Sequence, residues 1–164
     1  MSHTDIGAIH LTSAWLALVT GTVVCFDGKG HAVHRALGIT YVAAMIATNV
    51  AAFGMYRLTG SFTLFHAFAA LSLLTVGVSM GRLFSRRADR IAAHGVWMLR
   101  SYIGLLAAAV VESSVRLPAV RHWLGSPDGI LWFGAAVAVL FTVVGRMIIV
   151  RTMARPVTFA PDQG

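Results

Sequence analysis

The sequence predicts an all-α fold, an integral membrane bundle of five transmembrane helices with a four-helix core. Of its 164 residues, 57% are hydrophobic and only 12% are charged, and the mean hydropathy is +0.77. A soluble domain carries about 25% charged residues, so this chain lacks the polar surface that a water-soluble globule needs. Its apolar residues also gather in stretches of about 20, the length that crosses a bilayer as a helix.

The predicted spans follow one another with short polar connections. We place them at residues 6–26, 34–56, 62–81, 91–115 and 129–150. The first span has no basic segment ahead of it and is long enough to cross the bilayer, so we do not interpret it as a signal peptide. A polar connection beginning near Pro118 precedes the fifth helix, whose start is indicated by Ser126 and Pro127. The length allows one domain, residues 1–150, and we expect the tail 151–164 to be mobile.

The charges predict an orientation. The chain has 13 Lys and Arg against 6 Asp and Glu, a net charge of +7. The cations lie in short loops between apolar spans, so the positive-inside rule explains them and we exclude nucleic-acid binding. We name the membrane face that holds the N-terminus side A and the opposite face side B. Side B carries nine of the twelve loop and terminal cations, which predicts an outside N-terminus and a cytoplasmic C-terminus.

Four of the predicted helices begin with a histidine: His10, His34, His66 and His94. Each separation is about one span plus one turn, so the chain direction alternates from one histidine to the next. His10 and His66 therefore lie towards side A, and His34 and His94 towards side B. A single histidine at a helix end is more often an interfacial side chain than a ligand. The alternation across four helices favours two binding pairs.

The chemistry of these histidine pairs restricts the kinds of ligand that they can bind. Imidazole binds Zn, Cu, Fe and Ni, but a closed zinc site needs four ligands and no acidic or cysteine partner stands beside the pairs. The single cysteine, Cys25, excludes an internal disulfide and a C-x-x-C-H haem attachment motif. A histidine pair in an apolar slot suits haem b, with the four histidines as axial ligands of two haem irons.

Small residues on the histidine faces leave room either for a flat ligand or for a close helix neighbour. On the first three helices they are Ala14, Ala17, Gly21, Gly38, Ala70 and Gly77. Both interpretations stay open from the sequence.

Residues 6–115, with one histidine on each of four helices, resemble the transmembrane cytochromes of the cytochrome b561 type. The resemblance implies two b haems, one near each membrane face, and electron transfer across the membrane. A second resemblance is to a family of small, uncharacterised bacterial membrane proteins, which implies the bacterial inner membrane. It rests on Lys29-Gly30 with His34–Gly38, on Phe65-His66, and on His94 with Trp97–Tyr102. That second resemblance implies no activity.

Three more residues are candidates for the cofactor site. Arg35 and Arg100 lie towards side B, where a haem propionate is one partner and the lipid headgroups are the other. Arg100 lies within a span, where an ionisable group is expensive and needs a partner. Glu112 lies towards side A, where it can meet the site of His10 and His66 or a quinol, or form an ion pair with Arg116 four residues on.

The sequence therefore predicts a transmembrane b-type cytochrome, an oxidoreductase in the sense that electrons pass through its haems. The lipid bilayer is its expected environment, and a quinol or a small reductant is the expected donor. The alternative is a non-redox membrane subunit or transporter whose histidines bind a metal ion or relay protons. The oligomeric state is open, and a homodimer is compatible with the sequence.

Overall fold

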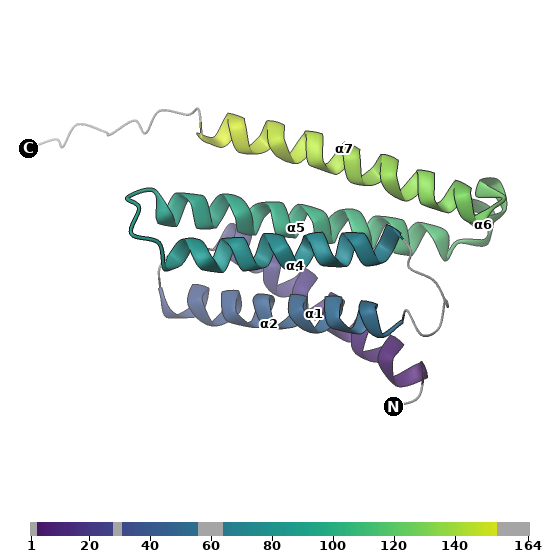
Figure 1. The fold of residues 1–164 in the computed structure, drawn as a ribbon, viewed down its shortest axis with the longest axis horizontal. Coiled ribbons are helices and arrows are strands. Elements are labelled where there is room, and N and C mark those ends of the chain that lie inside the picture. Colours follow the sequence, from purple (N-terminus) through teal and green to yellow (C-terminus); the bar gives the residue numbers. More distant parts are fainter. Residues whose placement is uncertain (1–2, 28–30, 56–63, 154–164) are drawn as a thin grey trace, which may run out of the picture.

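The computed structural model describes residues 3–27, 31–55 and 64–153, and all of its regular elements are helices (Figure 1). They are α1 His3–Phe26, α2 Ala32–Gly54, α4 Leu64–Leu83, α5 Arg90–Val115, α6 Pro118–Leu124 and α7 Pro127–Met153. Five of these helices, all except α6, are long and apolar enough to cross a membrane. The predicted all-α membrane fold with five spans is confirmed.

The helix bounds differ from the predicted spans by only a few residues, with one exception between α5 and α7. There the sequence indicated a polar connection, and the structure has the short helix α6 instead. Pro118 occupies its first turn, and Gly125 ends it with a left-handed φ of 64°, which glycine adopts without steric cost. Residues 151–153 continue α7, while the rest of the predicted mobile tail, 154–164, lies outside the described residues.

Four helices form a ring, and the fifth lies outside it. Helix α1 packs against α2, α2 against α4, α4 against α5, and α5 closes the ring with a less extensive contact to α1. Helix α7 packs along the outer side of α5, as Figure 1 shows. This arrangement makes α1 and α4 one diagonal of the ring, and α2 and α5 the other.

The middle of the ring is tightly packed. Its buried cluster consists of Ala17, Tyr41, Ala44, Met45, Val76 and Leu105. The Tyr41 hydroxyl lies 3.0 Å from the Ser101 hydroxyl, and Tyr102 bonds Thr22 through its hydroxyl group, so α5 is tied to both α2 and α1. A Cβ at Gly21 would lie within 3 Å of the rings of Tyr41 and Tyr102. At this position the small residue serves a close neighbour.

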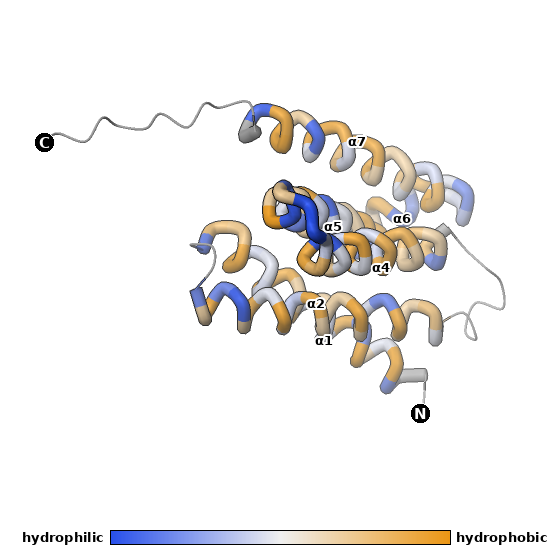
Figure 2. The backbone as a smooth tube through the Cα atoms, turned by 60° about the vertical axis from the view of Figure 1, so that its left-hand side comes forward, coloured by the Kyte–Doolittle hydropathy of each residue, from blue (hydrophilic) through white to orange (hydrophobic). Residues whose placement is uncertain are grey.

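The outer surface suits a bilayer. Large apolar side chains are exposed along every long helix, among them Trp15, Ile39, Leu74, Trp132 and Val139. Figure 2 shows hydrophobic colour along most of the five helices and strongly hydrophilic colour where α4 turns into α5. Apolar surface of this extent is stable only when lipid or protein covers it, so the chain is a membrane protein.

Candidate functional site

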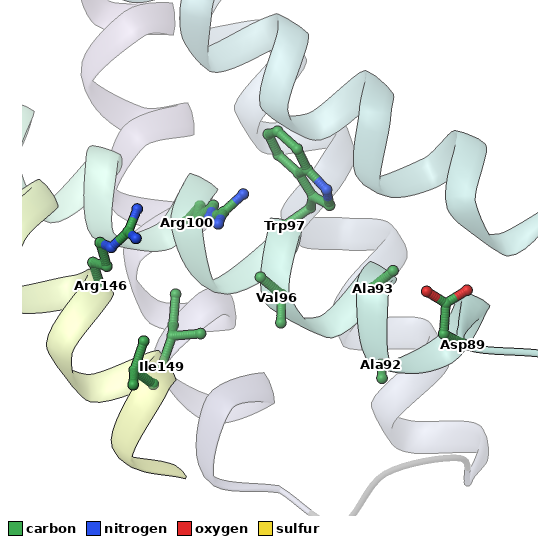
Figure 3. Close-up of a pocket in the computed structure, with 9 residues that line it drawn as sticks. Asp89, Ala92, Ala93, Val96, Trp97, Arg100, Arg146 and Ile149 are labelled. Atoms are coloured by element: carbon green, nitrogen blue, oxygen red, sulfur yellow. The ribbon is translucent and has the colours of Figure 1, made fainter. Parts of the chain in front are cut away.

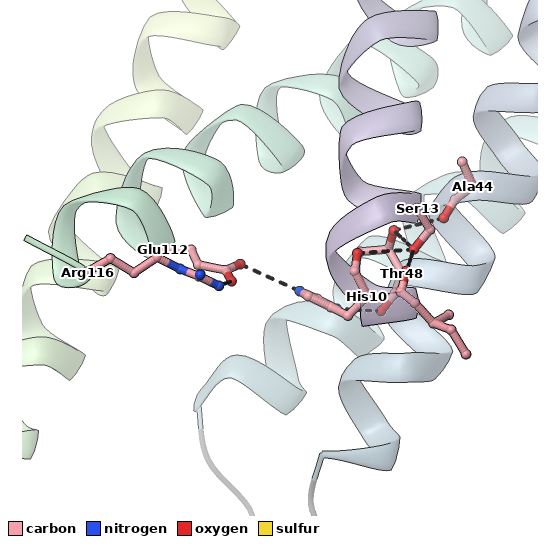
Figure 4. Close-up of polar contacts among 7 residues, drawn as sticks. His10, Ser13, Ala44, Thr48, Glu112 and Arg116 are labelled. Atoms are coloured by element: carbon pink, nitrogen blue, oxygen red, sulfur yellow. Dashed lines mark hydrogen bonds and ion pairs between the residues drawn. The ribbon is translucent and has the colours of Figure 1, made fainter. Parts of the chain in front are cut away.

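The side A end of the ring contains a chain of polar contacts that starts at His10 (Figure 4). The Nδ1 atom of His10 lies 3.0 Å from the carbonyl oxygen of Thr48 on α2. Its Nε2 atom lies 3.5 Å from the carboxylate of Glu112 on α5. Both ring nitrogens thus face acceptors, and a doubly protonated imidazolium satisfies both with N–H donors.

Glu112 also bonds Arg116, one turn further along α5. The sequence had offered His10 and Arg116 as alternative partners of Glu112, and the structure brings it to both. The carboxylate lies between a histidine and a guanidinium, so the three side chains form one charged network that spans α1 and α5. Thr48, whose carbonyl oxygen faces His10, extends these polar contacts: its hydroxyl donates a hydrogen bond of 2.8 Å to the Ser13 hydroxyl.

His66 lies near the same end of the ring on α4 and is 4% exposed. Its ring packs against Phe53 of α2, with the two ring centroids 6.1 Å apart. His10 and His66 therefore belong to opposite helices of one diagonal, and each of them contacts α2.

At the side B end, His94 is fixed by Ser79. The Nδ1 atom of His94 lies 3.0 Å from the carbonyl oxygen of Ser79 and 3.0 Å from its hydroxyl oxygen. The same hydroxyl donates a 3.0 Å bond to the backbone carbonyl of His94. Because Nδ1–H donates to a carbonyl, the neutral ring keeps its lone pair on Nε2. Sequence reasoning missed Ser79, whose only signal is a polar residue near the end of an apolar helix.

His34 lies near the same end, on the opposite helix of the second diagonal. Its Nδ1 atom is buried and has no hydrogen-bond partner among the residues that the structure describes. The neighbouring His31 has a capping role: its Nδ1 accepts a hydrogen bond from the backbone N–H of His34, and its Nε2 lies 3.1 Å from Asp27. These contacts explain why His31 stands directly before α2.

The two predicted arginines are exposed, and neither forms an ion pair among the described residues. Arg35 is exposed in the first turn of α2. Arg100 lines a groove between α5 and α7, with its guanidinium carbon 4.7 Å from the ring centroid of Trp97. Six residues on a helix turn the direction by roughly 240° from His94, so the two side chains leave α5 on different faces. The structure does not bring Arg100 together with His34 and His94.

The small residues on the histidine faces divide into two groups. Gly21 is covered by aromatic rings, as described above. A Cβ at Gly38 or at Gly77 would have no atom of another element within 4 Å. Gly77 is exposed on the outside of α4, whereas Gly38 is partly buried one turn after His34, so open space exists beside Gly38.

Within the described ranges 3–27, 31–55 and 64–153, no three His, Cys, Asp or Glu side chains form a group able to hold a metal ion. A group bound here would have to be held by histidine pairs and apolar walls. The sequence model of the family described as "Predicted membrane protein (DUF2306)" matches residues 7–153. The chain belongs to this family.

The DUF2306 description specifies a membrane protein, so the predicted resemblance is confirmed at the level of a membrane-protein family. Nothing in it links the family to the cytochromes of the b561 type, and that resemblance stays a prediction. No curated protein and no solved structure has significant similarity to the chain.

Proposed function

We propose that this DUF2306 protein is a b-type cytochrome that transfers electrons across the bilayer through two haems. His10 and His66 would hold one haem near side A, and His34 and His94 the other near side B. One observation carries the proposal: each pair belongs to one diagonal of the helix ring, and the two pairs lie at opposite ends. A flat group inside the four-helix ring would be held by side chains from opposite helices, as each histidine pair is placed.

The way His94 is fixed supports the proposal. Histidines that bind metals usually donate their second ring N–H to a carbonyl or carboxylate, which sets the tautomer and the ring orientation. The Nδ1 of His94 has this contact with the Ser79 carbonyl, on a neighbouring helix. His10 makes the same contact with Thr48. The open space beside the partly buried Gly38 further suits a flat apolar group in the side B half.

Haem, when bound, supplies an iron that accepts and releases one electron at a time. The chain contributes the axial histidines, and its buried middle layer around Tyr41 and Met45 keeps water out between the two ends. On side A, the Nε2 of His10 faces Glu112, so His10 could hold a haem through Nε2 only if this carboxylate turned away. The freed carboxylate stays paired with Arg116, which supplies the compensating charge.

The proposal includes a location and two redox partners. We propose the inner membrane of a bacterium, with the N-terminus outside and the C-terminus in the cytoplasm. Without Arg100 and Arg146, which lie within α5 and α7, side B holds eight of the eleven remaining cations. The donor is a quinol or a small reductant that gives electrons at one face, and an acceptor takes them at the other.

The network of His10, Glu112 and Arg116 favours a second candidate function, a proton relay. Ionisable residues inside a membrane span mark proton or ion pathways, and His10 and Glu112 lie within spans. With Arg116, which follows the end of α5, they join α1 and α5 in one polar chain. In this alternative the proton passes between His10 Nε2 and the Glu112 carboxylate, and no redox group takes part.

Absorption spectroscopy of the purified protein separates the two functions. The cytochrome gives a Soret band that shifts on reduction with dithionite, and a haem assay should find about two haems per chain. A colourless protein after expression with ample haem supply contradicts the cytochrome proposal. The relay then predicts proton flux into proteoliposomes, and Glu112→Gln should abolish that flux.

A further inference from the structure

A groove runs between α5 and α7 in the side B half of the protein, away from the ring interior (Figure 3). Its volume is about 460 Å³, within the range of small-molecule sites. It is lined from α5 by Asp89, Ala92, Ala93, Val96, Trp97 and Arg100, and from α7 by Arg146, Ile149 and Val150. The groove contains two arginines and one acidic residue.

The two arginines carry charge that no carboxylate of the described residues neutralises by an ion pair. Arg100 is placed over the ring of Trp97, and neither it nor Arg146 forms a salt bridge with the parts of the chain that are described. Asp89 is already paired, because its carboxylate lies 3.1 Å from Nε of Arg87. It also stands eleven residues from Arg100, at the other end of the groove in Figure 3.

Both arginines belong to helices that cross the membrane, so their charges are expensive there. Arg100 is ten residues beyond the start of α5, or about 15 Å along the helix axis. Side chains on a helix lean towards its N-terminus. On the antiparallel helices α5 and α7, Arg100 leans towards side B and Arg146 towards side A, which brings the two cations to a similar depth. Two permanent like charges in one groove favour the binding of an anion between them.

The remaining lining identifies the anion as part of an amphipathic molecule. Val96 and Ile149 form an apolar floor next to the arginines, and Trp97 adds an aromatic wall of the kind found at the membrane interface. The same end of the protein carries a basic connection between α4 and α5, which attracts anionic lipids. Its cations are Arg82, Arg86, Arg87 and Arg90.

We propose that this groove binds an anionic phospholipid, with its phosphate between the guanidinium groups of Arg100 and Arg146 and its glycerol and acyl chain on the apolar floor. Arginine offers planar N–H donors that match phosphate oxygens in pairs. The bound lipid would fasten α7 to α5. The inference concerns a site outside the helix ring and holds whether or not the histidines bind haem.

The test compares lipid retention by three proteins purified in the same detergent. They are the wild type, the double variant Arg100→Gln/Arg146→Gln and the control Arg121→Gln/Arg151→Gln. The control removes two charges, one from α6 and one from α7, that lie outside both the groove and the basic connection. Each protein is reconstituted in vesicles of phosphatidylglycerol or of phosphatidylcholine and extracted again, and its bound lipid is measured by native mass spectrometry. Helical content by circular dichroism verifies that all three are folded.

We expect wild type and control to keep a single phosphatidylglycerol, and the double variant to retain about tenfold less, which corresponds to about 1.4 kcal/mol. Phosphatidylcholine should be retained weakly and equally by all three. If the double variant does not fold, Arg100→Lys/Arg146→Lys replaces it: this pair keeps the charge but loses the planar fork, and should retain less lipid than wild type. Equal retention by variant and control overturns the proposal. Displacement of the lipid by inorganic phosphate alone overturns it too, because the groove would then select free phosphate.

Discussion

The Nε2 atom of His10 lies 3.5 Å from the carboxylate of Glu112, and this contact joins α1 to α5 where the helix ring is least extensively packed. The first and fourth spans of the sequence meet here through charge rather than through apolar packing. Glu112 is also bonded to Arg116, so the contact depends on a carboxylate shared by two partners. The side A end of the ring is therefore a site where substitution should change both stability and function.

The first prediction measures this contact. Glu112→Gln and His10→Gln should each lower the stability in detergent, and the double variant should lose less than the sum of the two. The side chain of Glu112 is 41% exposed, which limits the coupling between the pair to about 0.5–1 kcal/mol. Thermal unfolding followed by circular dichroism gives the values. In the control cycle, His10→Gln is combined with Arg121→Gln, a residue outside the network, and the two losses of stability should add. If the losses for His10→Gln and Glu112→Gln also add, the contact does not contribute to stability.

The second prediction concerns ligation. Replacing His34 or His94 by alanine should remove one haem, and replacing His10 or His66 should remove the other, so that each variant keeps about half of the haem. We expect this because each histidine pair lies on its own diagonal of the helix ring and at its own end of the bundle. A haem assay normalised to protein concentration measures the ratio. Loss of all haem in a single variant, with no effect in the other three, is incompatible with two separate pairs.

The fold could be predicted because a membrane restricts the options. Spans of about 20 apolar residues must be helices, since the backbone polar groups find no water in the bilayer. Helix α6 was not predicted because its sequence signals are ambiguous. They are a proline in the first turn and a glycine after the last, and both are also typical of turns. Apolar periodicity does not help over a segment of that length.

The candidate site was less predictable. Alternating chain direction assigned each histidine to an end of the bundle, but the rotation of each helix about its axis depends on packing. This rotation decides that Arg100 faces α7 rather than the face of His94. It also decides that Ser79 meets His94, a contact between helices that no spacing in the sequence indicates. The aromatic cover over Gly21 arises in the same way.

The third prediction tests the close packing around Gly21. Gly21→Ala would place a Cβ within 3 Å of the rings of Tyr41 and Tyr102, and should cost about 1–3 kcal/mol of stability through overpacking. Gly104→Ala is the control, because no atom of another element lies within 4 Å of its Cβ position, and alanine favours a helix. The melting temperature should fall for Gly21→Ala and rise for Gly104→Ala. An unchanged melting temperature for Gly21→Ala contradicts the packing.

The fourth prediction concerns orientation. A reporter fused after Gly164 should be cytoplasmic, because side B holds eight of the eleven cations other than Arg100 and Arg146. Alkaline phosphatase is active only outside the cytoplasm. Green fluorescent protein fluoresces only in the cytoplasm, because it does not fold after export by the general secretion route. We therefore expect fluorescence and no phosphatase activity from the two fusions. The reverse result would place side B outside the cytoplasm and would contradict the proposed orientation.

The fifth prediction follows from the way Ser79 fixes His94. Ser79 is fully buried, and its hydroxyl bonds both Nδ1 and the backbone carbonyl of His94. Ser79→Ala removes these bonds and leaves the backbone carbonyl of residue 79 as the acceptor for Nδ1–H. The ring should keep its tautomer, while the protein loses about 1 kcal/mol of stability.

Under the cytochrome proposal, the weakened contact makes the His94 imidazole a poorer electron donor to iron, which raises the reduction potential of the side B haem and leaves the other haem unchanged. A redox titration followed by absorption measures both potentials. Ser72→Ala is the matched control, since Ser72 lies on the same helix and loses one hydrogen bond, to Asn49, remote from His94. Equal shifts in the two variants would mean that the change reflects helix α4 as a whole, and Ser79 would then have no particular influence on His94.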